Sequence, residues 1–174
     1  MAKVLIEGIY CDQLWEPNGE LRFDSGWRKN MIVMQGRRLL AGFMKNEATA
    51  HGIQSMKIGH GDPLWDTNPP PQPDPNTMSK LVDAAPFVIT GGNLTLQYLL
   101  PDDTPTLNVT NRVQITAVLG PGQPVPAGNP PYQMREFGLF GQLTGGDFMI
   151  DYIRHPLIEK DGLVTLERKV RLIF

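Results

Sequence analysis

Cysteine is nearly absent from this chain of 174 residues, and that scarcity excludes two kinds of structure. Cys11 has no second cysteine with which to form an internal disulfide, and alone it cannot build a cysteine-rich zinc site. Long hydrophobic runs are missing too, since no apolar stretch approaches the roughly 20 residues that a membrane-spanning helix needs. The first ten residues, interrupted by Glu7 and Gly8, lack the apolar core of a signal peptide. We therefore expect a protein without a membrane segment that folds in a reducing cytoplasm.

An excess of either charge is also lacking. The chain has 16 lysines and arginines against 18 aspartates and glutamates, a formal net charge of -2. The basic residues are scattered and form no stripe that would neutralise a run of phosphates, so we expect no nucleic-acid partner. A hydrophobic share of 41% over this length is enough for a self-sufficient core. The sequence thus predicts a single domain over residues 1–174.

Proline, in contrast, is abundant and concentrated. Of the 16 prolines, 11 fall in two stretches, Pro63–Pro75 and Pro121–Pro131. Proline fixes φ and removes a backbone donor, so neither stretch is expected to be a helix or a central strand. We expect the first to be extended and partly polyproline II, and the second to be a long exposed loop between two strands.

One segment has helical periodicity. Between Lys29 and Asn46, apolar residues recur at three- and four-residue spacing: Ile32, Leu39, Leu40 and Phe43. Asn30 or Ser25 is the expected N-cap. Gly36 and Gly42 weaken such a helix but would let it lie close against a sheet. The spacing predicts a helix over about residues 29–46 whose apolar face packs on the core.

Most of the remaining chain alternates between apolar and polar residues, as half-buried strands do. The pattern predicts two long strands at 106–119 and 163–174, and shorter ones at 2–10, 20–24, 52–59, 82–90, 93–100, 134–140 and 148–154. Gly91-Gly92 is a hairpin signal, and Pro86 marks its strand as an edge or a bulge. We predict a mainly β protein: an antiparallel β-sandwich with one packed α-helix and two long proline-rich loops.

Histidines and acids offer one possible metal site. His51, His60 and Asp62 carry ligand types that suit a divalent metal. They occupy a loop and a strand end, however, and the third histidine, His155, is distant in the sequence. Loop and hydrogen-bonding roles are the favoured interpretation, and we expect neither a metal nor a cofactor.

Two carboxylates near the second half of the chain resemble, in residue type only, the acid/base pair of a glycosidase. Glu136 with Asp147 or Asp151 would form that pair. Solvated strand charges or a cross-strand ion pair are favoured instead, because Glu136 follows an arginine directly. Cys11 is no better as a nucleophile, since the neighbouring Asp12 would raise the pKa of its thiol. We expect no catalytic residues.

Tryptophan in the first proline-rich stretch points to a partner. A loop-anchoring role is ordinary for Trp65, but its proline-rich setting disfavours a place in the core. For Trp27, a packing role is favoured. Long loops are costly to order, and proline lowers that cost, so such loops suit binding in extended form against a neighbour. The residues expected to contact partners are Trp65, Pro69, Pro70, Pro71, Pro124 and Pro126.

Three motifs occur in an order that resembles a known group. They are the Trp27–Val33 start of the predicted helix, the Ile53–Asp62 strand with its Gly-His-Gly end, and Arg135–Phe140, which reads REFGLF and precedes a Gly145-Gly146 turn. Over roughly residues 27–174 this order is similar to small bacteriophage and prophage tail proteins with a "REGLF"-like closing element. The chain departs from that group in its long proline-rich loops and in Phe137, where a small residue is usual.

The resemblance implies a non-enzymatic structural protein of a bacteriophage or phage-like particle, in the tail, baseplate or neck. Such a protein acts by self-association, as a homo-oligomer, and by binding neighbouring virion proteins. Its expected location is the virion, after folding in the cytoplasm of the host bacterium. The alternative is a receptor- or glycan-binding module of a tail fibre, and a glycan hydrolase is least favoured.

Overall fold

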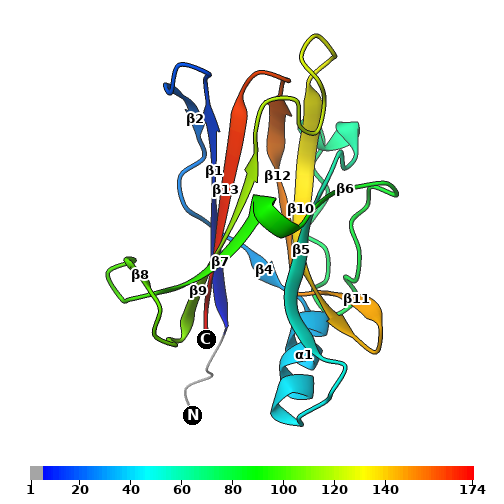
Figure 1. Cartoon of the computed structure of the whole chain (residues 1–174). Helices are drawn as coiled ribbons and strands as arrows, with labels where there is room; N and C mark the ends of the chain where they lie inside the picture. The colour runs from blue at the N-terminus through cyan, green and yellow to red at the C-terminus, as the bar shows by residue number, and fades with distance from the viewer. Residues whose placement is uncertain (1–5) are drawn as a thin grey trace. The chain divides into compact units, whose positions relative to one another are not determined.

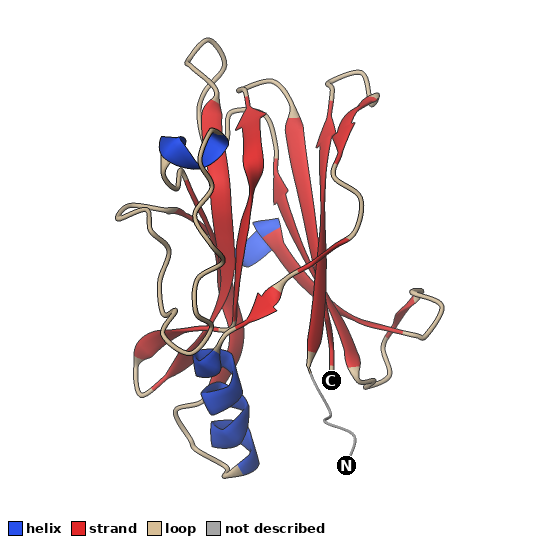
Figure 2. Ribbon diagram, turned by 180° about the vertical axis from the view of Figure 1, so that it is seen from behind, coloured by secondary structure: helices blue, strands red, loops and turns tan. Residues whose placement is uncertain are grey.

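The structure is a computed structural model, and it describes residues 6–174. It is mainly β, with two antiparallel sheets and a single α-helix (Figures 1 and 2). This confirms the predicted fold class, because the content is consistent with a β-sandwich that carries one helix. No helix in the described part of the chain has both the length and the apolar character needed to cross a membrane.

The chain forms two compact units, each built on one of the sheets. The first unit contains the residues up to Asn30, Gly91–Pro130 and Lys160–Phe174, and the second contains Met31–Thr90 and Pro131–Glu159. The chain therefore passes between the units four times. The expectation of a single domain stays a prediction.

The sheet of the first unit has the strand order β2-β1-β13-β9-β7-β8, and β3 also pairs with β1. Its strands are β1 (Glu7–Trp15), β2 (Leu21–Asp24), β3 (Arg28–Lys29), β7 (Leu94–Leu99), β8 (Pro105–Thr106), β9 (Arg112–Leu119) and β13 (Thr165–Ile173). β13 lies between β1 and β9 and pairs antiparallel with both, with β1 over Thr165–Ile173 and with β9 over Leu166–Ile173. The C-terminal strand is thus a central strand of this sheet.

The sheet of the second unit has the order β4-β12-β10-β5-β6, and β11 also pairs with β10. Its elements are β4 (Met31–Ile32), α1 (Met34–Met44), β5 (His51–Gly59), the 3-10 helix η1 (Pro63–Asp66), β6 (Phe87–Ile89), β10 (Tyr132–Leu143), β11 (Gly146–Met149) and β12 (Asp151–Lys160). A cluster of buried side chains holds this unit together: Val33, Leu81, Phe140, Met149 and Tyr152.

Helix α1 is shorter than predicted. The backbone of Met31–Ile32 pairs with β12, so the helix cannot begin before that ladder ends. Its N-cap is the buried Val33, with no side-chain cap, and the assignment of Asn30 or Ser25 as N-cap is wrong. The expected close approach is confirmed at Gly36, where an added Cβ would lie 2.7 Å from the carbonyl oxygen of Ile150.

Several strand predictions fail where the chain turns. Of the predicted strand 82–90 only β6 forms, and the predicted strand 148–154 is interrupted at Ile150 between β11 and β12. Residues 107–111 bend away from the ladder, so the predicted strand 106–119 is reduced to β8 and β9. The Gly91-Gly92 hairpin is absent, because these residues begin the 3-10 helix η2 (Gly91–Asn93) and the flanking strands β6 and β7 belong to different sheets. The predicted strand at 2–10 overlaps β1, and its first residues lie outside the described part of the chain.

The closing strand follows the predicted alternation with two exceptions. Val164, Leu166, Val170 and Leu172 are buried as expected. Arg168 also lies on that buried face, whereas Phe174 is 42% exposed. A charged residue in an apolar row needs a partner, and β1 supplies it in Asp12.

A candidate partner-binding groove

The second unit contains a surface groove between the first proline-rich segment and strand β12. Its volume is about 600 Å³, within the range of pockets that bind ligands or partner side chains. We call it the Trp65 groove. It is lined by Trp65, Asp66, Pro69, Gln72, Arg154, His155, Pro156 and Leu157.

The groove wall starts with one turn of 3-10 helix. Asp62 caps η1, because its side-chain oxygen accepts a hydrogen bond of 2.9 Å from the N–H of Leu64. Pro63 fits the first position of that turn, where no backbone donor is needed. The expectation of an extended conformation is therefore wrong for Pro63–Asp66, since the cap and the proline favour a turn.

An arginine fork anchors this turn to β10. Arg135 donates from Nε and Nη2 to the two carboxylate oxygens of Asp66, at 2.8 and 2.7 Å. It also donates to the carbonyl oxygen of His60, at 3.1 Å. The two parallel bonds fix the carboxylate geometrically and hold the pKa of Asp66 below its usual value. The side chain of Arg135 is only 4% exposed, so the anchor is nearly covered.

A second arginine holds the remainder of the segment. Arg154, on β12, donates to the carbonyl oxygens of Pro70 and Pro71. The centre of its guanidinium lies 5.4 Å from the ring centroid of Trp65, at cation–π distance. Gly61 has φ +60° and leaves room for the indole, because an added Cβ there would lie 2.4 Å from the Trp65 ring. The segment is therefore fixed in place.

Four of the predicted contact residues meet at this groove. Trp65 and Pro69 line it, while Pro70 and Pro71 hold Arg154 through their carbonyl oxygens. What the sequence did not predict is that two arginines order the segment.

The other two predicted contact residues, Pro124 and Pro126, belong to the first unit. Their loop connects β9 to β10, as expected, and Pro126 is exposed while Pro124 is half-buried. The loop is fastened at its start, where the buried Lys160 donates to the carbonyl oxygen of Gly120 at 3.0 Å.

Glu136 is buried, and its expected role as a solvated or ion-paired strand charge is wrong. It lies on β10, which has neighbours on both sides in the sheet. Its carboxylate accepts hydrogen bonds from the N–H of Val82 and of Asp83 and from the hydroxyl of Tyr152, at 3.1, 2.7 and 2.9 Å. Burial and this carboxylate raise the pKa of Tyr152. Glu136 thereby holds the 82–83 loop to the sheet.

The acids proposed as partners of Glu136 have other contacts. Asp151 is buried and accepts a hydrogen bond of 2.7 Å from the N–H of Leu139. Asp147 is largely exposed and pairs with Lys57 at 2.5 Å. Each carboxylate therefore supports the fold locally.

Of the residues weighed as metal ligands, His51 is separated from His60 and Asp62 by the length of a strand. His51 begins β5 and His60 follows its last residue, which puts them roughly 30 Å apart at the usual rise of a strand. His60 lies 2.6 Å from the carbonyl oxygen of Gln133 through Nδ1, and its ring lies 4.2 Å from that of Tyr132. Over residues 6–174, no group of three or more ligand-type side chains could hold a metal ion.

Cys11 and Trp27 also have clear environments. The thiol of Cys11 lies 3.4 Å from a carboxylate oxygen of Asp24, and burial and that contact raise its pKa to about 11. The direction agrees with the prediction, but burial is the main cause. Trp27 is 42% exposed, and its ring centroid lies 4.0 Å from the guanidinium of Arg171. Trp27 thus stacks on a strand residue and is not part of the core.

Sequence reasoning missed two buried cations in the first unit. Arg168 pairs with Asp12, which is fully buried, and Lys160 donates to the carbonyl oxygens of Gly120, Asp161 and Val164. A basic residue at an inward position of an alternating strand was the signal for Arg168. For Lys160, at the end of β12, the sequence held no such signal.

These contacts define a groove with an ordered wall. No protein-family model matches the chain, and no curated protein or solved structure is significantly similar to it. The likeness to phage tail proteins accordingly rests on the three sequence motifs.

Proposed function

We propose that this protein is a non-enzymatic structural protein of a bacteriophage or phage-like particle, in the tail, baseplate or neck. It acts by associating with itself and by binding neighbouring virion proteins. The three motifs, which occur in the same order as in phage tail proteins, support the assignment to a phage-like particle. The Trp65 groove supports the proposal that the protein acts by binding partners.

The observation that carries the proposal is the fixation of the first proline-rich segment by Arg135 and Arg154. A free loop of this length would lose much conformational freedom on binding. Here that loss is incurred when the chain folds, so a partner meets a rigid surface and binds with less entropic cost. An exposed, rigid, proline-rich wall beside a groove is well suited to permanent assembly.

The carboxylates weighed for catalysis support the same interpretation. Glu136 accepts three hydrogen bonds that hold a loop and a tyrosine, Asp151 accepts one from the N–H of Leu139, and Asp147 pairs with Lys57. Carboxylates used in this way stabilise the fold.

Incorporation into particles tests the proposal. The chain is to be expressed with its flanking genes, and sedimenting particles assayed for the protein. Trp65→Ala combined with Pro69→Asp is expected to reduce incorporation at least tenfold, whereas Trp27→Ala, a half-exposed tryptophan in the first unit, serves as the matched control. Thermal unfolding of both variants checks that the fold is retained. Absence of the wild-type protein from particles would refute the proposal.

A tail-fibre module that binds a receptor or glycan is the second candidate. One feature favours it: the groove places Trp65 beside the polar side chains of Asp66 and Gln72, a combination that suits sugar rings and hydroxyls. Binding to a panel of bacterial surface glycans, lost on Trp65→Ala, would favour this candidate.

A further inference from the structure

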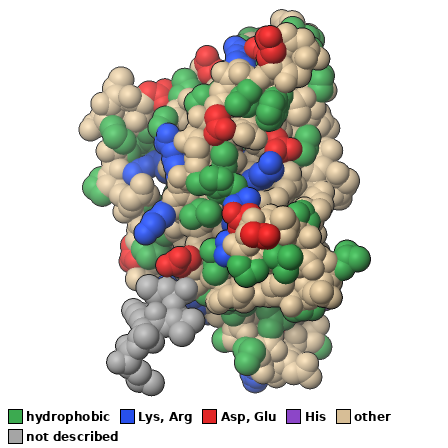
Figure 3. All heavy atoms as spheres, turned by 90° about the vertical axis from the view of Figure 1, so that its left-hand side faces the viewer, with side chains coloured by type: hydrophobic (Ala, Val, Ile, Leu, Met, Phe, Trp, Pro, Cys, Tyr) green, Lys and Arg blue, Asp and Glu red, His purple; other side chains and the backbone are tan. Residues whose placement is uncertain are grey.

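The exposed face of α1 carries basic side chains and an apolar one. Arg37, Arg38 and Lys45 are exposed, and Met44 beside them is 89% exposed. The helix itself contains no acidic residue. Figure 3 keeps the vertical axis of Figure 1, where α1 lies lowest, and shows hydrophobic and basic side chains at that end. We call Arg37, Arg38, Met44 and Lys45 the α1 patch.

Two cations of the α1 patch lack an acidic partner. Lys45 pairs with Glu47 at 3.4 Å. In the part of the chain that the structure describes, no carboxylate lies within ion-pair distance of Arg37 or Arg38. Both guanidinium groups are therefore available to a partner.

The acids near α1 are already bonded. Glu47 and Asp147 each pair with a lysine. Asp74 accepts two hydrogen bonds from one asparagine, and Asp151 is buried. At the surface of this end, Arg37, Arg38, Lys45 and Lys57 lie beside three carboxylates. An excess of positive charge remains there.

The opposite end of the same sheet is acidic. Its carboxylates are Asp62, Asp66, Asp83 and Glu159, and its guanidiniums are Arg135 and Arg154. The hydrogen bonds from Arg135 to Asp66 and the charges of Asp66, Glu159 and Asp62 raise the pKa of Arg135, so these acids gather around it. With four acids against two bases, this end carries an excess of negative charge.

An exposed apolar side chain lies at the acidic end too. Leu64, in η1, is 67% exposed. Asp62 accepts the bond that caps η1, and the exposed Glu159 accepts one bond from a neutral glutamine. Because these partners are neutral, both carboxylates keep their charge. We call Asp62, Leu64 and Glu159 the η1 patch.

Strand β5 separates the two patches. α1 packs at the start of the strand, where a Cβ added to Gly42 would lie 3.7 Å from the Cβ of Ala50, and η1 follows the last residue of the strand (Figures 1 and 2). The nine residues of β5 span roughly 30 Å. The patches therefore cannot meet within one copy, and the complement of each lies on a second copy.

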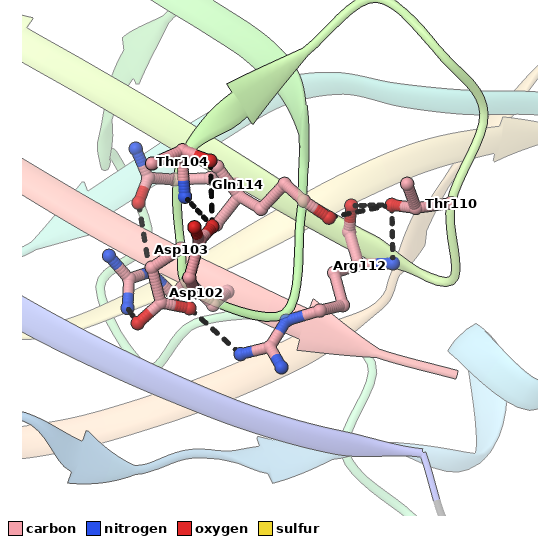
Figure 4. A network of polar contacts seen from close by, with 8 residues as sticks. Asp102, Asp103, Thr104, Thr110, Arg112 and Gln114 are labelled. Atoms are coloured by element: carbon pink, nitrogen blue, oxygen red, sulfur yellow. Dashed lines mark hydrogen bonds and ion pairs between the residues drawn. The ribbon is translucent and has the colours of Figure 1, made fainter.

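The charges of the first unit balance where Figure 4 shows them. Asp103 accepts hydrogen bonds of 2.8 Å from Arg112 and from Arg171, and Asp102 lies next to it in the chain. Two acids thus stand beside two bases. That surface attracts neither patch, whereas the α1 patch and the η1 patch attract each other.

We propose that the α1 patch of one copy binds the η1 patch of a second copy of this chain. The two arginines lie toward Asp62 and Glu159. Met44 contacts Leu64. The inference rests on the proposed function, because it names the surfaces through which self-association occurs. The two patches differ, so the contact is heterologous, and repetition builds a closed ring or an open filament.

Sedimentation velocity of the purified chain tests the role of the charges. Wild-type protein is expected to associate with rising concentration, and less so as the salt concentration rises. Arg37→Glu with Arg38→Glu is expected to weaken association by about tenfold or more. Lys29→Glu with Lys80→Glu makes the same change of charge at two exposed lysines outside the patches and should associate like wild type. A wild-type chain that stays monomeric at every concentration overturns the inference.

Two disabled chains should complement each other. Leu64→Lys with Glu159→Lys changes the η1 patch alone and should also prevent association. Mixed with the Arg37→Glu, Arg38→Glu chain, it should associate, because each chain keeps the patch that the other has lost. Thermal unfolding checks that both variants are folded. Folded variants that stay monomeric in the mixture overturn the head-to-tail contact.

Cross-linking between two differently tagged chains tests which residues meet. Met44→Cys on one chain and Leu64→Cys on the other should form a mixed disulfide under mild oxidation. Met44→Cys with Leu163→Cys, at a 57% exposed residue of the first unit, should not. The buried Cys11, with its pKa near 11, stays unreactive at pH 8. Equal yields for the two pairs overturn the contact. If that happens while Trp65→Ala with Pro69→Asp still blocks incorporation, the proposed function stands and this inference fails.

Discussion

The two units surround their buried charges with different partners. The first unit buries an ion pair, Asp12–Arg168, and the ammonium of Lys160, which lies among three backbone carbonyl oxygens. The second unit buries two carboxylates with neutral donors, since Glu136 and Asp151 accept hydrogen bonds from backbone N–H groups and Glu136 also accepts one from a tyrosine hydroxyl, and its buried Arg135 pairs with the partly exposed Asp66.

The difference shows which segments each kind of charge can hold. A buried carboxylate accepts from N–H groups of a nearby loop, as Glu136 does at residues 82–83. A buried ammonium donates to carbonyl oxygens, and Lys160 gathers those of two turns. Either kind of buried charge lowers the stability little while every hydrogen-bond partner is present. Removal of one partner lowers the stability a great deal.

Removal of the Asp12 carboxylate is expected to have the largest effect. Asp12→Ala leaves the buried Arg168 cation without its counter-ion, and we expect a loss of about 3–5 kcal/mol in the free energy of unfolding. Urea unfolding at pH 7 measures it. Asp12→Leu combined with Arg168→Met removes both charges and is expected to recover most of that stability. A double variant as unstable as Asp12→Ala would show that packing, not the buried charge, causes the loss.

Lys160→Met is expected to cause the second-largest loss in the free energy of unfolding. It leaves the carbonyl oxygens of Gly120, Asp161 and Val164 without the ammonium donor, at a cost of about 2–3 kcal/mol, partly offset because a charge no longer has to be buried. Burial lowers the pKa of Lys160, which agrees with that offset. Lys169→Met, at a half-exposed lysine paired with Glu167, is the control and should change stability by less than about 1 kcal/mol. Equal losses would contradict the assignment of Lys160 as an anchor.

Glu136→Gln tests the second unit and should cost about 1–2 kcal/mol. The glutamine amide keeps one acceptor oxygen, but its NH₂ group replaces the second one. That NH₂ group then faces a donor that was bonded to the carboxylate, and the hydrogen bond is lost. Glu159→Gln changes the same groups on an exposed side chain that accepts one bond from Gln133, so thermal unfolding should hardly change. A Glu136→Gln protein as stable as wild type would show that this carboxylate is not needed to hold the loop.

The sequence predicted regular elements well where burial alternates without interruption. The alternation at residues 112–119 and 163–174 gave β9 and β13, since a half-buried strand must repeat every second residue. It failed at Leu107 and Val109, whose residue types fit a strand although no ladder forms there. Residue type alone does not reveal whether a neighbouring strand is present.

Only the proline-rich wall of the groove was indicated by the sequence. Proline content and Trp65 indicated the segment, but its order depends on Arg135 and Arg154, which are distant in the sequence. Charged residues in strands are usually solvated, so nothing local marked these two as anchors. Long-range hydrogen bonds of this kind become visible only in the folded chain.

The smallest expected effect is that of acid on the pair Arg135–Asp66, whose aspartate is partly exposed, whereas both members of the pair Asp12–Arg168 are buried. The fork lowers the pKa of Asp66 in the folded chain. Its stabilising effect is therefore complete above the unfolded value near 3.8 and is lost as the pH falls through the lower folded value. We expect pepsin to cleave near Leu64 increasingly as the pH falls from 4 to 2.

Asp66→Asn removes the titrating group and should be cleaved there readily already at pH 4, with little change in global unfolding. Asp102→Asn, at another exposed aspartate with a lowered pKa, should not alter cleavage near Leu64. Asp66→Asn could instead lower the stability of the whole protein as much as Asp12→Ala is expected to do. In that case the degree of burial would not explain why the two ion pairs differ in their effect on stability. Because Asp66 is partly exposed and water can solvate its side chain once the pair separates, we expect only the proline-rich segment to loosen.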